Sequence, residues 1–125
     1  MGNRTNPRCS NGSLRRRNRR RLRFEGRPCW ICQVFGRDAR IDYSLPATHP
    51  LSFEVDEIVP VSRYWLGGYG SPEQCAADYS NLAAAHRACN QWRSNRTVAE
   101  VVAEAARARS AEAAKKDGLP QPWGL

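Results

Sequence analysis

The clearest pattern of polar and apolar positions is a partial alternation along residues 52–59, SFEVDEIV, which ends at Pro60. A period of two residues places successive side chains on opposite faces of a strand, and proline has no N–H to offer a strand ladder. The pattern therefore predicts a strand over 52–59. A shorter second strand is expected over 81–84, NLAA, and a helix is expected to begin near His86 and to run through Trp92.

Helical spacing dominates the C-terminal part of the chain. Valines and alanines recur at intervals of three and four residues from Val98 to Ala105. This spacing predicts one helix over 97–117. A glycine and a proline directly after it are expected to end the helix, which leaves 118–125 as an extended tail.

Charge is distributed unevenly along the chain. Residues 1–28 hold ten arginines and one glutamate, a formal net charge of +9, whereas the whole chain has +8, so the remainder sums to −1. An arm of this composition, with asparagine, glycine and serine between its charges, buries little apolar surface, and we expect residues 1–27 to be disordered when alone. Its expected partner is a polyanion, because each neutralised phosphate releases condensed counterions.

Composition also narrows the setting in which the protein works. The sequence contains no run of about 18 apolar residues, so no membrane-spanning helix is expected. The basic N-terminus lacks the apolar stretch of a secretory signal, which predicts a cytoplasmic protein. Five cysteines, an odd number, favour metal ligation over a disulfide framework in a reducing compartment.

Two pairs of metal-ligating residues share the same spacing. Two residues separate Cys29 from Cys32, and two separate His86 from Cys89. This spacing lets both side chains of a pair reach one tetrahedral ion, and thiolate and imidazole are the ligands that zinc prefers. Four protein ligands would make the zinc structural, and it would stabilise the small α+β domain expected over 28–96. In the alternative interpretation the cysteines are buried apolar residues and the histidine is an ordinary core residue.

Two cysteines fall outside this pattern. Cys9 lies in the basic arm and Cys75 in the turn-rich loop that follows residue 67, and neither has a partner at ligand spacing. We expect both to stay outside the metal site. Replacement of His86 by Cys75 as the fourth ligand is the alternative.

The order of these motifs resembles that of the HNH endonucleases. The matching segments, in chain order, are Cys29-x-x-Cys32, FEVDEIVP at 53–60, SNL at 80–82 and His86-x-x-Cys89-Asn90. The likeness covers roughly residues 28–96 and is nearest to the zinc-containing branch that is common in phages and prophages. It implies a ββα-metal (His-Me finger) fold, in which two strands and one helix hold a single divalent cation.

The resemblance also implies roles for individual residues. Asp56, near the end of the first strand, and Asn90, on the helix, would be ligands of a catalytic Mg²⁺ or Mn²⁺, and Asn81 would orient the catalytic base through a hydrogen bond. A hard cation prefers oxygen ligands and keeps several waters, so one carboxylate and one amide leave room for a phosphate. The cation would stabilise charge on the scissile phosphate and on its departing 3′-oxygen.

Glu57 departs from the family pattern. Family members usually place histidine directly after the metal-binding aspartate, where it deprotonates the attacking water. Glutamate, with an ordinary pKa of about 4.3, is a weaker base than imidazole at about 6.5, although a carboxylate tuned by its surroundings can serve. The alternatives are that Glu57 binds the cation as a second carboxylate, that His49 folds back as the base, or that the site has lost catalysis.

These features predict an HNH-type, metal-dependent endonuclease that hydrolyses duplex DNA with little sequence preference. The basic side chains expected to contact DNA are Arg15, Arg16, Arg17, Arg19, Arg20, Arg21, Arg87 and Arg93. The alternatives are a zinc-containing DNA-binding module without catalysis and an assembly protein that holds packaged nucleic acid. The resemblance suggests a phage-infected or lysogenic bacterium as the setting and a phage packaging or replication protein as a partner; the sequence does not predict an oligomeric state.

Overall fold

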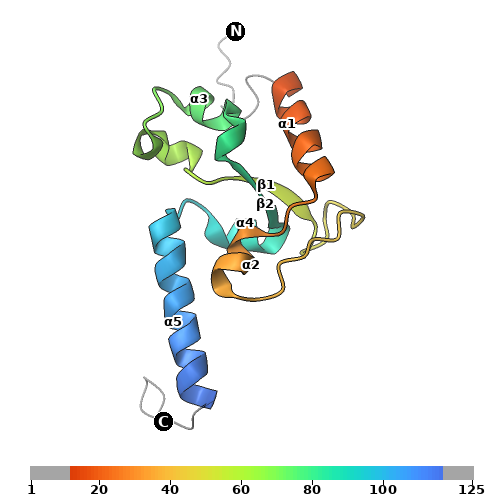
Figure 1. Ribbon diagram of the computed structural model, residues 1–125. Helices are drawn as coiled ribbons and strands as arrows, with labels where there is room; N and C mark the ends of the chain where they lie inside the picture. Colours follow the sequence, from red (N-terminus) through yellow and green to blue (C-terminus); the bar gives the residue numbers. More distant parts are fainter. Residues whose placement is uncertain (1–11, 117–125) are drawn as a thin grey trace.

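The computed structural model describes residues 12–116, which form helices and one pair of strands. In chain order the elements are α1 (Gly12–Glu25), α2 (Trp30–Phe35), β1 (Phe53–Glu57), η2 (Val61–Gly67), α3 (Pro72–Ala77), η3 (Tyr79–Asn81), β2 (Leu82–His86), α4 (Arg87–Arg93) and α5 (Val98–Lys116), where η denotes a 3-10 helix. The α+β class that the sequence predicts is confirmed. β1 pairs with β2 although η2, α3 and η3 lie between them in the chain, and α4 follows β2 directly (Figure 1).

The two strands are antiparallel, and their residue ranges lie close to those predicted from the sequence. Their register runs from Phe53 opposite His86 to Glu57 opposite Leu82. β1 is shorter than the expected 52–59, because beyond Glu57 the backbone bonds to Asn81 instead of to β2. β2 begins one residue later than expected and continues to His86, so α4 starts directly after the strand.

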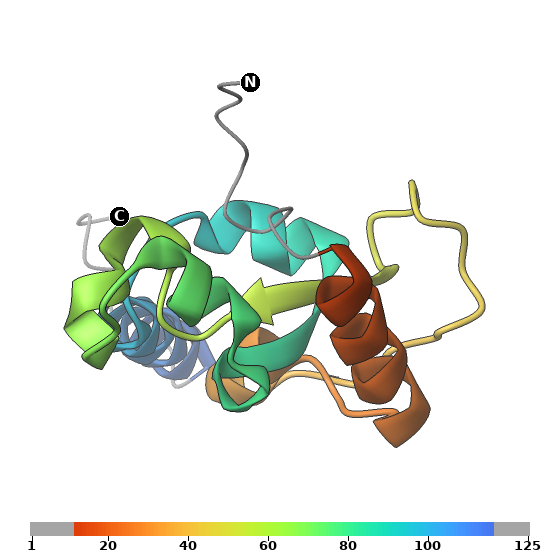
Figure 2. The same cartoon turned by 90° about the horizontal axis from the view of Figure 1, so that it is seen from above.

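The sheet separates α1 from the other helices that pack on it (Figure 2). Strand side chains alternate between the two faces. The face that carries Phe53 packs against Leu22 of α1, and the face that carries Ala85 packs against α2. Consecutive strand residues therefore divide between the faces: Asp56 lies on the side of α2 and α4, and Glu57 lies on the side of α1.

α1 corrects one expectation, since residues 12–25 of the arm expected to be disordered form a helix. Leu22 is fully buried against the sheet, and Asn18 donates its amide to the Ala77 carbonyl (3.4 Å). Arginine favours helices, and its long apolar stem covers neighbouring apolar surface. Three arginines lie over aromatic rings: Arg19 over Phe53, Arg21 over Tyr79 and Arg23 over Tyr43. Residues 1–11 of the arm lie outside the described range.

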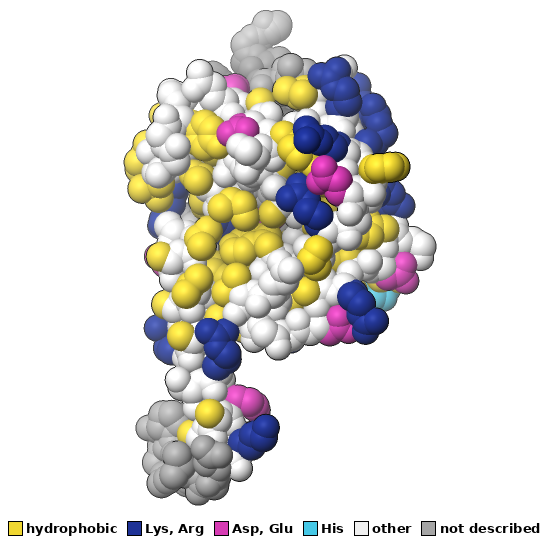
Figure 3. Space-filling view, in the orientation of Figure 1, with side chains coloured by type: hydrophobic (Ala, Val, Ile, Leu, Met, Phe, Trp, Pro, Cys, Tyr) yellow, Lys and Arg dark blue, Asp and Glu magenta, His cyan; other side chains and the backbone are white. Residues whose placement is uncertain are grey.

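The outer surface of α1 is strongly basic (Figure 3). Arg16, Arg17 and Arg20 are exposed there, whereas Arg15 is half-buried and reaches the sheet. The packing of Leu22 thus turns one face of the helix inward and leaves a row of guanidinium groups toward solvent.

α5 extends away from the rest of the fold (Figure 1). Thr97 and Glu100 form a reciprocal cap: the Glu100 N–H donates to Thr97 Oγ1 (3.1 Å), and the Thr97 N–H donates to Glu100 Oε1 (2.8 Å). Val101 and Ala105 are fully buried, and α5 packs on α2. The tail expected over 118–125 lies outside the described residues. Among the helices of residues 12–116, none has both the length and the apolar character needed to cross a membrane.

Candidate functional site

The four predicted zinc ligands come together in one cluster. The ligand atoms of Cys29, Cys32, His86 and Cys89 all lie within 4.8 Å of one another. Cys32 Sγ is 3.4 Å from His86 Nδ1 and 3.7 Å from Cys89 Sγ, and Cys89 Sγ is 3.8 Å from His86 Nδ1. Around a tetrahedral zinc with ordinary bond lengths, neighbouring ligand atoms are separated by about 3.5–3.8 Å. The cluster therefore has the size and the donor set of a structural metal site.

Hydrogen bonds around the cluster prepare His86 and Cys29 to act as ligands. His86 Nε2 lies 3.0 Å from the Arg40 carbonyl oxygen. A carbonyl can only accept, so Nε2 carries the proton and Nδ1 keeps its lone pair toward the sulfurs. The backbone N–H groups of Cys32 and His86 both donate to Cys29 Sγ (3.5 and 3.4 Å). These donors favour the thiolate form that binds a metal.

The cysteines of the cluster change one another's pKa values, and the positive charge of Arg37 lies beside two of them. Interaction with the Cys89 thiol lowers the pKa of Cys29 to about 4, and the same interaction raises the pKa of Cys89. Arg37 donates from Nε to Cys32 Sγ (3.4 Å) and from Nη2 to Cys89 Sγ (3.7 Å), which raises the pKa of the guanidinium. Three thiolates exceed the charge of Zn²⁺ by one, so a cation at this place is complementary. The contact of Arg37 with the cluster was not predicted from the sequence. The only signal for it was the position of Arg37 just after the short helix that carries Cys32.

A cavity of about 660 Å³ opens between the end of β1, α1 and α4. Its lining includes all three acids of β1, the amide of Asn90 and three arginines: Glu54, Asp56, Glu57, Asn90, Arg15, Arg19 and Arg93. Asp56 and Asn90, predicted as ligands of one cation, thus border the same space. The six charged groups balance formally, since three are acidic and three are basic.

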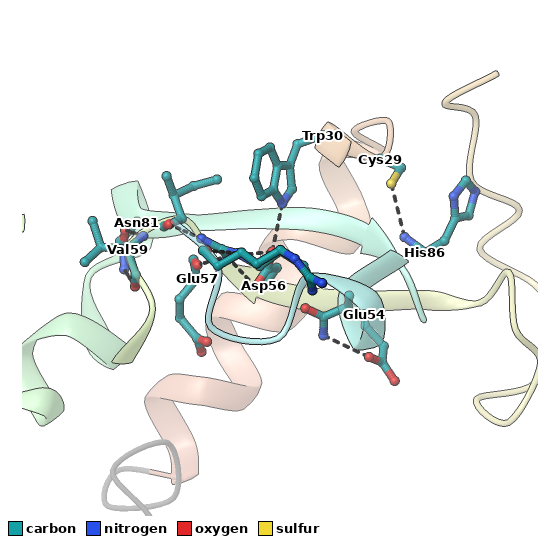
Figure 4. A network of polar contacts seen from close by, with 12 residues as sticks. Cys29, Trp30, Glu54, Asp56, Glu57, Val59, Asn81 and His86 are labelled. Carbon is teal, nitrogen blue, oxygen red and sulfur yellow. Dashed lines mark hydrogen bonds and ion pairs between the residues drawn. The ribbon is translucent and has the colours of Figure 1, made fainter. Parts of the chain in front are cut away.

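Asp56 lines this cavity and is itself buried, with Trp30 close to its carboxylate (Figure 4). Its Oδ2 accepts a hydrogen bond from Trp30 Nε1 (2.8 Å). Arg93 Nη1 lies 3.0 Å from Oδ1 and 2.9 Å from Oδ2. Burial raises the pKa of Asp56, and the Arg93 charge and the Trp30 hydrogen bond act against that rise. Oδ1 accepts one of these bonds and Oδ2 two, so Oδ1 retains acceptor capacity toward a further ligand.

Arg93 is placed differently from the expectation that it contacts DNA. The residue is 0 % exposed. Besides Asp56, its guanidinium donates to the backbone carbonyls of Glu57 and Ile58, and Nε donates to that of Arg96 (2.7 Å). All three nitrogens of the guanidinium, Nε, Nη1 and Nη2, thus donate to acceptors within the protein. Position 93 therefore joins α4 to the end of β1 and does not present a free surface charge.

Glu57 and Asn81 both lie at the end of the sheet. The Glu57 carboxylate contacts a side chain of α1, whereas the Asn81 amide bonds to backbone groups. The Glu57 side chain is 5 % exposed, and its Oε2 lies 3.4 Å from Arg15 Nη1 of α1. Asn81 Oδ1 accepts the Val59 N–H (2.8 Å), and Nδ2 donates to the Val59 and Cys75 carbonyls (3.1 and 3.3 Å). Asn81 therefore holds the backbone two residues beyond Glu57. The role expected for Asn81, to orient the catalytic base, stays a prediction.

The remaining candidates occupy the rim or lie elsewhere. Asn90 donates its amide to Glu54 Oε1 (2.9 Å), and Arg87 pairs with the same carboxylate (3.6 Å) while donating to the Thr48 carbonyl (2.6 Å). The alternative base His49 instead accepts the Leu51 N–H in its own loop. The alternative zinc ligand Cys75 packs in another core cluster, with Val61 and Ala76.

No family model, curated protein or solved structure matches this chain. The geometry of the described residues contains two features: a Cys3His cluster suited to a structural metal, and a cavity that Asp56 lines together with other acids, an amide and arginines.

Proposed function

We propose that this protein is an HNH-type endonuclease that binds duplex DNA and hydrolyses its phosphodiester bonds with a catalytic divalent cation. The observation that carries the proposal is the convergence of Asp56, Glu57 and Asn90 on one cavity, in a fold that also contains the Cys3His cluster. These residues belong to motifs whose order in the sequence resembles the family. A shared cavity is what a single-metal phosphodiesterase requires of them.

Structural zinc fits the Cys3His cluster in donor type, spacing and charge. Zinc in this position would join α2 to the end of β2 and the start of α4, because its ligands come from both regions. Cys89 is followed directly by Asn90, so a metal ligand and a cavity residue share one turn of α4. We infer that the zinc supports the geometry of the cavity without taking part in the reaction.

A hard divalent cation fits the donors of the cavity. Asp56, Asn90 and Glu54 would offer oxygen ligands from β1 and α4, which suits Mg²⁺ or Mn²⁺. Such a cation polarises the phosphate and stabilises the departing oxygen. It would also change the cavity from formally neutral to +2, so affinity for the DNA backbone should rise when the divalent cation is bound.

Within this proposal one residue of the protein takes up a proton, another keeps the end of β1 in place, and others bind the DNA backbone. Glu57 accepts the proton of the attacking water, and the Asn81 clamp on Val59 keeps the end of β1 in place. Arg15 and Arg19 lie one helical turn apart on α1 and line the cavity, where they can meet the phosphates next to the scissile bond. The exposed arginines of α1 supply affinity that does not depend on sequence.

A second candidate is a zinc-containing DNA-binding module without catalysis. The specific observation in its favour is that protein cations already compensate the acids of the cavity. Arg93 contacts both oxygens of Asp56, and Arg15 pairs with Glu57. A site of this kind could retain its fold and its basic surface without cutting.

Cleavage of supercoiled plasmid in Mg²⁺, Mn²⁺ or EDTA separates the two candidates. The variants are Asp56→Asn, which keeps the shape of the side chain, together with Glu57→Gln and Glu57→His. Glu112→Gln, an exposed change on α5, is the matched control. An endonuclease requires the divalent cation, loses cutting in Asp56→Asn, and is slowed about 10²-fold or more in Glu57→Gln.

Faster cutting by Glu57→His would identify the glutamate as a weak base at an otherwise intact site. If every variant is silent while zinc stays bound and DNA still shifts in a gel, the endonuclease proposal fails and the binding module is the function. Zinc content and the DNA shift are measured on the same samples, so loss of folding is not mistaken for loss of catalysis.

A further inference from the structure

Trp30 lies between the two cysteines of the first metal-ligating pair and contacts Asp56, which lines the cavity. It is the first residue of α2, and Cys29 directly before it caps that helix. The indole Nε1 donates to Asp56 Oδ2 at 2.8 Å, across 26 positions of sequence (Figure 4). The same short segment therefore contributes thiolates to the Cys3His cluster and a hydrogen-bond donor to Asp56.

The cluster fixes the backbone from which the indole projects. Cys29 donates its backbone N–H to the Ala39 carbonyl (2.7 Å), and Cys29 Sγ accepts N–H groups from Cys32 and His86. Both Cys29 and Cys32 are buried. The residue between them has little freedom to move unless the cluster itself changes shape.

Asp56 depends on such partners for its orientation. The terminal torsion of an aspartate side chain joins an sp³ to an sp² carbon and has no sharp preference of its own. The rotation of the carboxylate is therefore decided by the groups that donate to it. Among the contacts of the described residues these are Trp30 Nε1 and Arg93 Nη1.

Trp30 also contacts the second of these groups. The Arg93 guanidinium lies over the Trp30 ring, with Cζ 5.2 Å from the ring centroid. Trp30, Asp56 and Arg93 thus form a mutually contacting triad, of which Asp56 and Arg93 are buried. Movement of the indole would disturb the carboxylate directly and through the arginine.

We propose that Trp30 is a positioning residue that couples the Cys3His metal cluster to Asp56. A metal in the cluster sets the position of α2, and the indole N–H transmits that position to the carboxylate of Asp56. The consequence for cation binding and cleavage rests on the proposed function. The coupling between the cluster and Asp56 does not, since it can be read in a protein without activity.

Trp30→Phe tests the coupling with little change in shape, because it keeps an aromatic ring under Arg93 and removes the N–H. Trp92→Phe is the matched control: Trp92 lies edge-on to Phe35, with ring centroids 5.5 Å apart, on the outer side of α4. Both variants are prepared as the full zinc-loaded chain. Zinc stoichiometry is expected to stay at the wild-type value, and a circular dichroism spectrum checks that both variants fold.

Mn²⁺ binding, followed by electron paramagnetic resonance, is the first readout. Loss of an outer hydrogen bond to a metal ligand typically weakens metal affinity about 10- to 100-fold. We expect a loss in that range for Trp30→Phe and less than about twofold for Trp92→Phe. In plasmid cleavage at a saturating concentration of the divalent cation, Trp30→Phe should lower kcat and leave the KM for DNA unchanged, because the basic surface of α1 is intact. Equal Mn²⁺ affinity in wild type and Trp30→Phe overturns the proposal.

The indole N–H resonances of ¹⁵N-labelled protein give the second readout, which needs no activity. Exchange of zinc for the larger Cd²⁺ in the cluster should shift the Trp30 signal, and Asp56→Asn should shift the same signal. The signal of the exposed Trp65 serves as the internal reference. A Trp30 signal that ignores both changes overturns the coupling. If wild type binds no Mn²⁺ and does not cut, the endonuclease proposal fails, while these shifts still decide whether Trp30 links the cluster to Asp56.

Discussion

Arg93→Met tests whether position 93 belongs to the interior or to a DNA-binding surface. The guanidinium is 0 % exposed, pairs with Asp56 and donates to three backbone carbonyls, those of Glu57, Ile58 and Arg96. Removal of one partner from a buried ion pair costs about 3–5 kcal/mol. Each carbonyl left without a donor adds about 1 kcal/mol. We therefore expect the free energy of unfolding to fall by about 6 kcal/mol or more.

Urea unfolding at saturating zinc measures this loss, since a metal bound only to the folded state would add to its stability by mass action. Arg20→Met, on the exposed face of α1, is the control. It should change the free energy of unfolding by less than about 0.5 kcal/mol and reduce the salt slope of DNA binding by about one. The double variant Asp56→Leu/Arg93→Met should recover part of the loss, because it leaves no unpaired buried charge. The reasoning is refuted if Arg93→Met unfolds like wild type and instead reduces the salt slope.

Three further predictions follow from the packing and the cluster. Leu22→Ala should cost about 2–5 kcal/mol and release α1 from the sheet, seen as loss of amide protection in α1, whereas Phe24→Ala, 92 % exposed, should leave that protection unchanged. Arg37→Met should weaken zinc binding about tenfold or more in a chelator competition, because it removes donors to Cys32 and Cys89; an unchanged affinity would show that these contacts do not matter. Chelation, or a fall in pH from 7 toward 5, should release zinc and reduce the ellipticity of the fold, since the ligands bind only when deprotonated; a circular dichroism spectrum insensitive to both would rule out a structural metal.

Local patterns account for the parts of the fold that could be predicted. The two strands and the long C-terminal helix follow from periodicities of two and of three to four residues, which need no knowledge of distant neighbours. Chain order alone could not predict the structure of residues 12–25. A run of arginines is favourable for a helix but also typical of a solvated arm. The burial of Leu22 against Phe53 is what fixes α1 on the sheet.

The cysteines and the histidine of the cluster could be identified from sequence because each pair is local, with two residues between its members, and because thiolate and imidazole have specific chemistry. The acidic motif of β1 was likewise visible. Contacts between segments far apart in the chain were decided only by the tertiary structure. Trp30 meets Asp56 across 26 positions, and Arg93 meets it across 37.

The residue type of a charged side chain does not show whether the side chain is buried or exposed. Arg93 and Arg20 look alike in the sequence, yet one is enclosed by backbone carbonyls and the other faces solvent. The alternation along β1 places Asp56 and Glu57 on opposite faces of the sheet. Their surroundings differ because α1 covers one face, whereas α2 and α4 cover the other. The sequence by itself determined which chemistry is present, because residue types and short spacings are local. Packing decided which groups meet, because burial and partner choice depend on the whole fold.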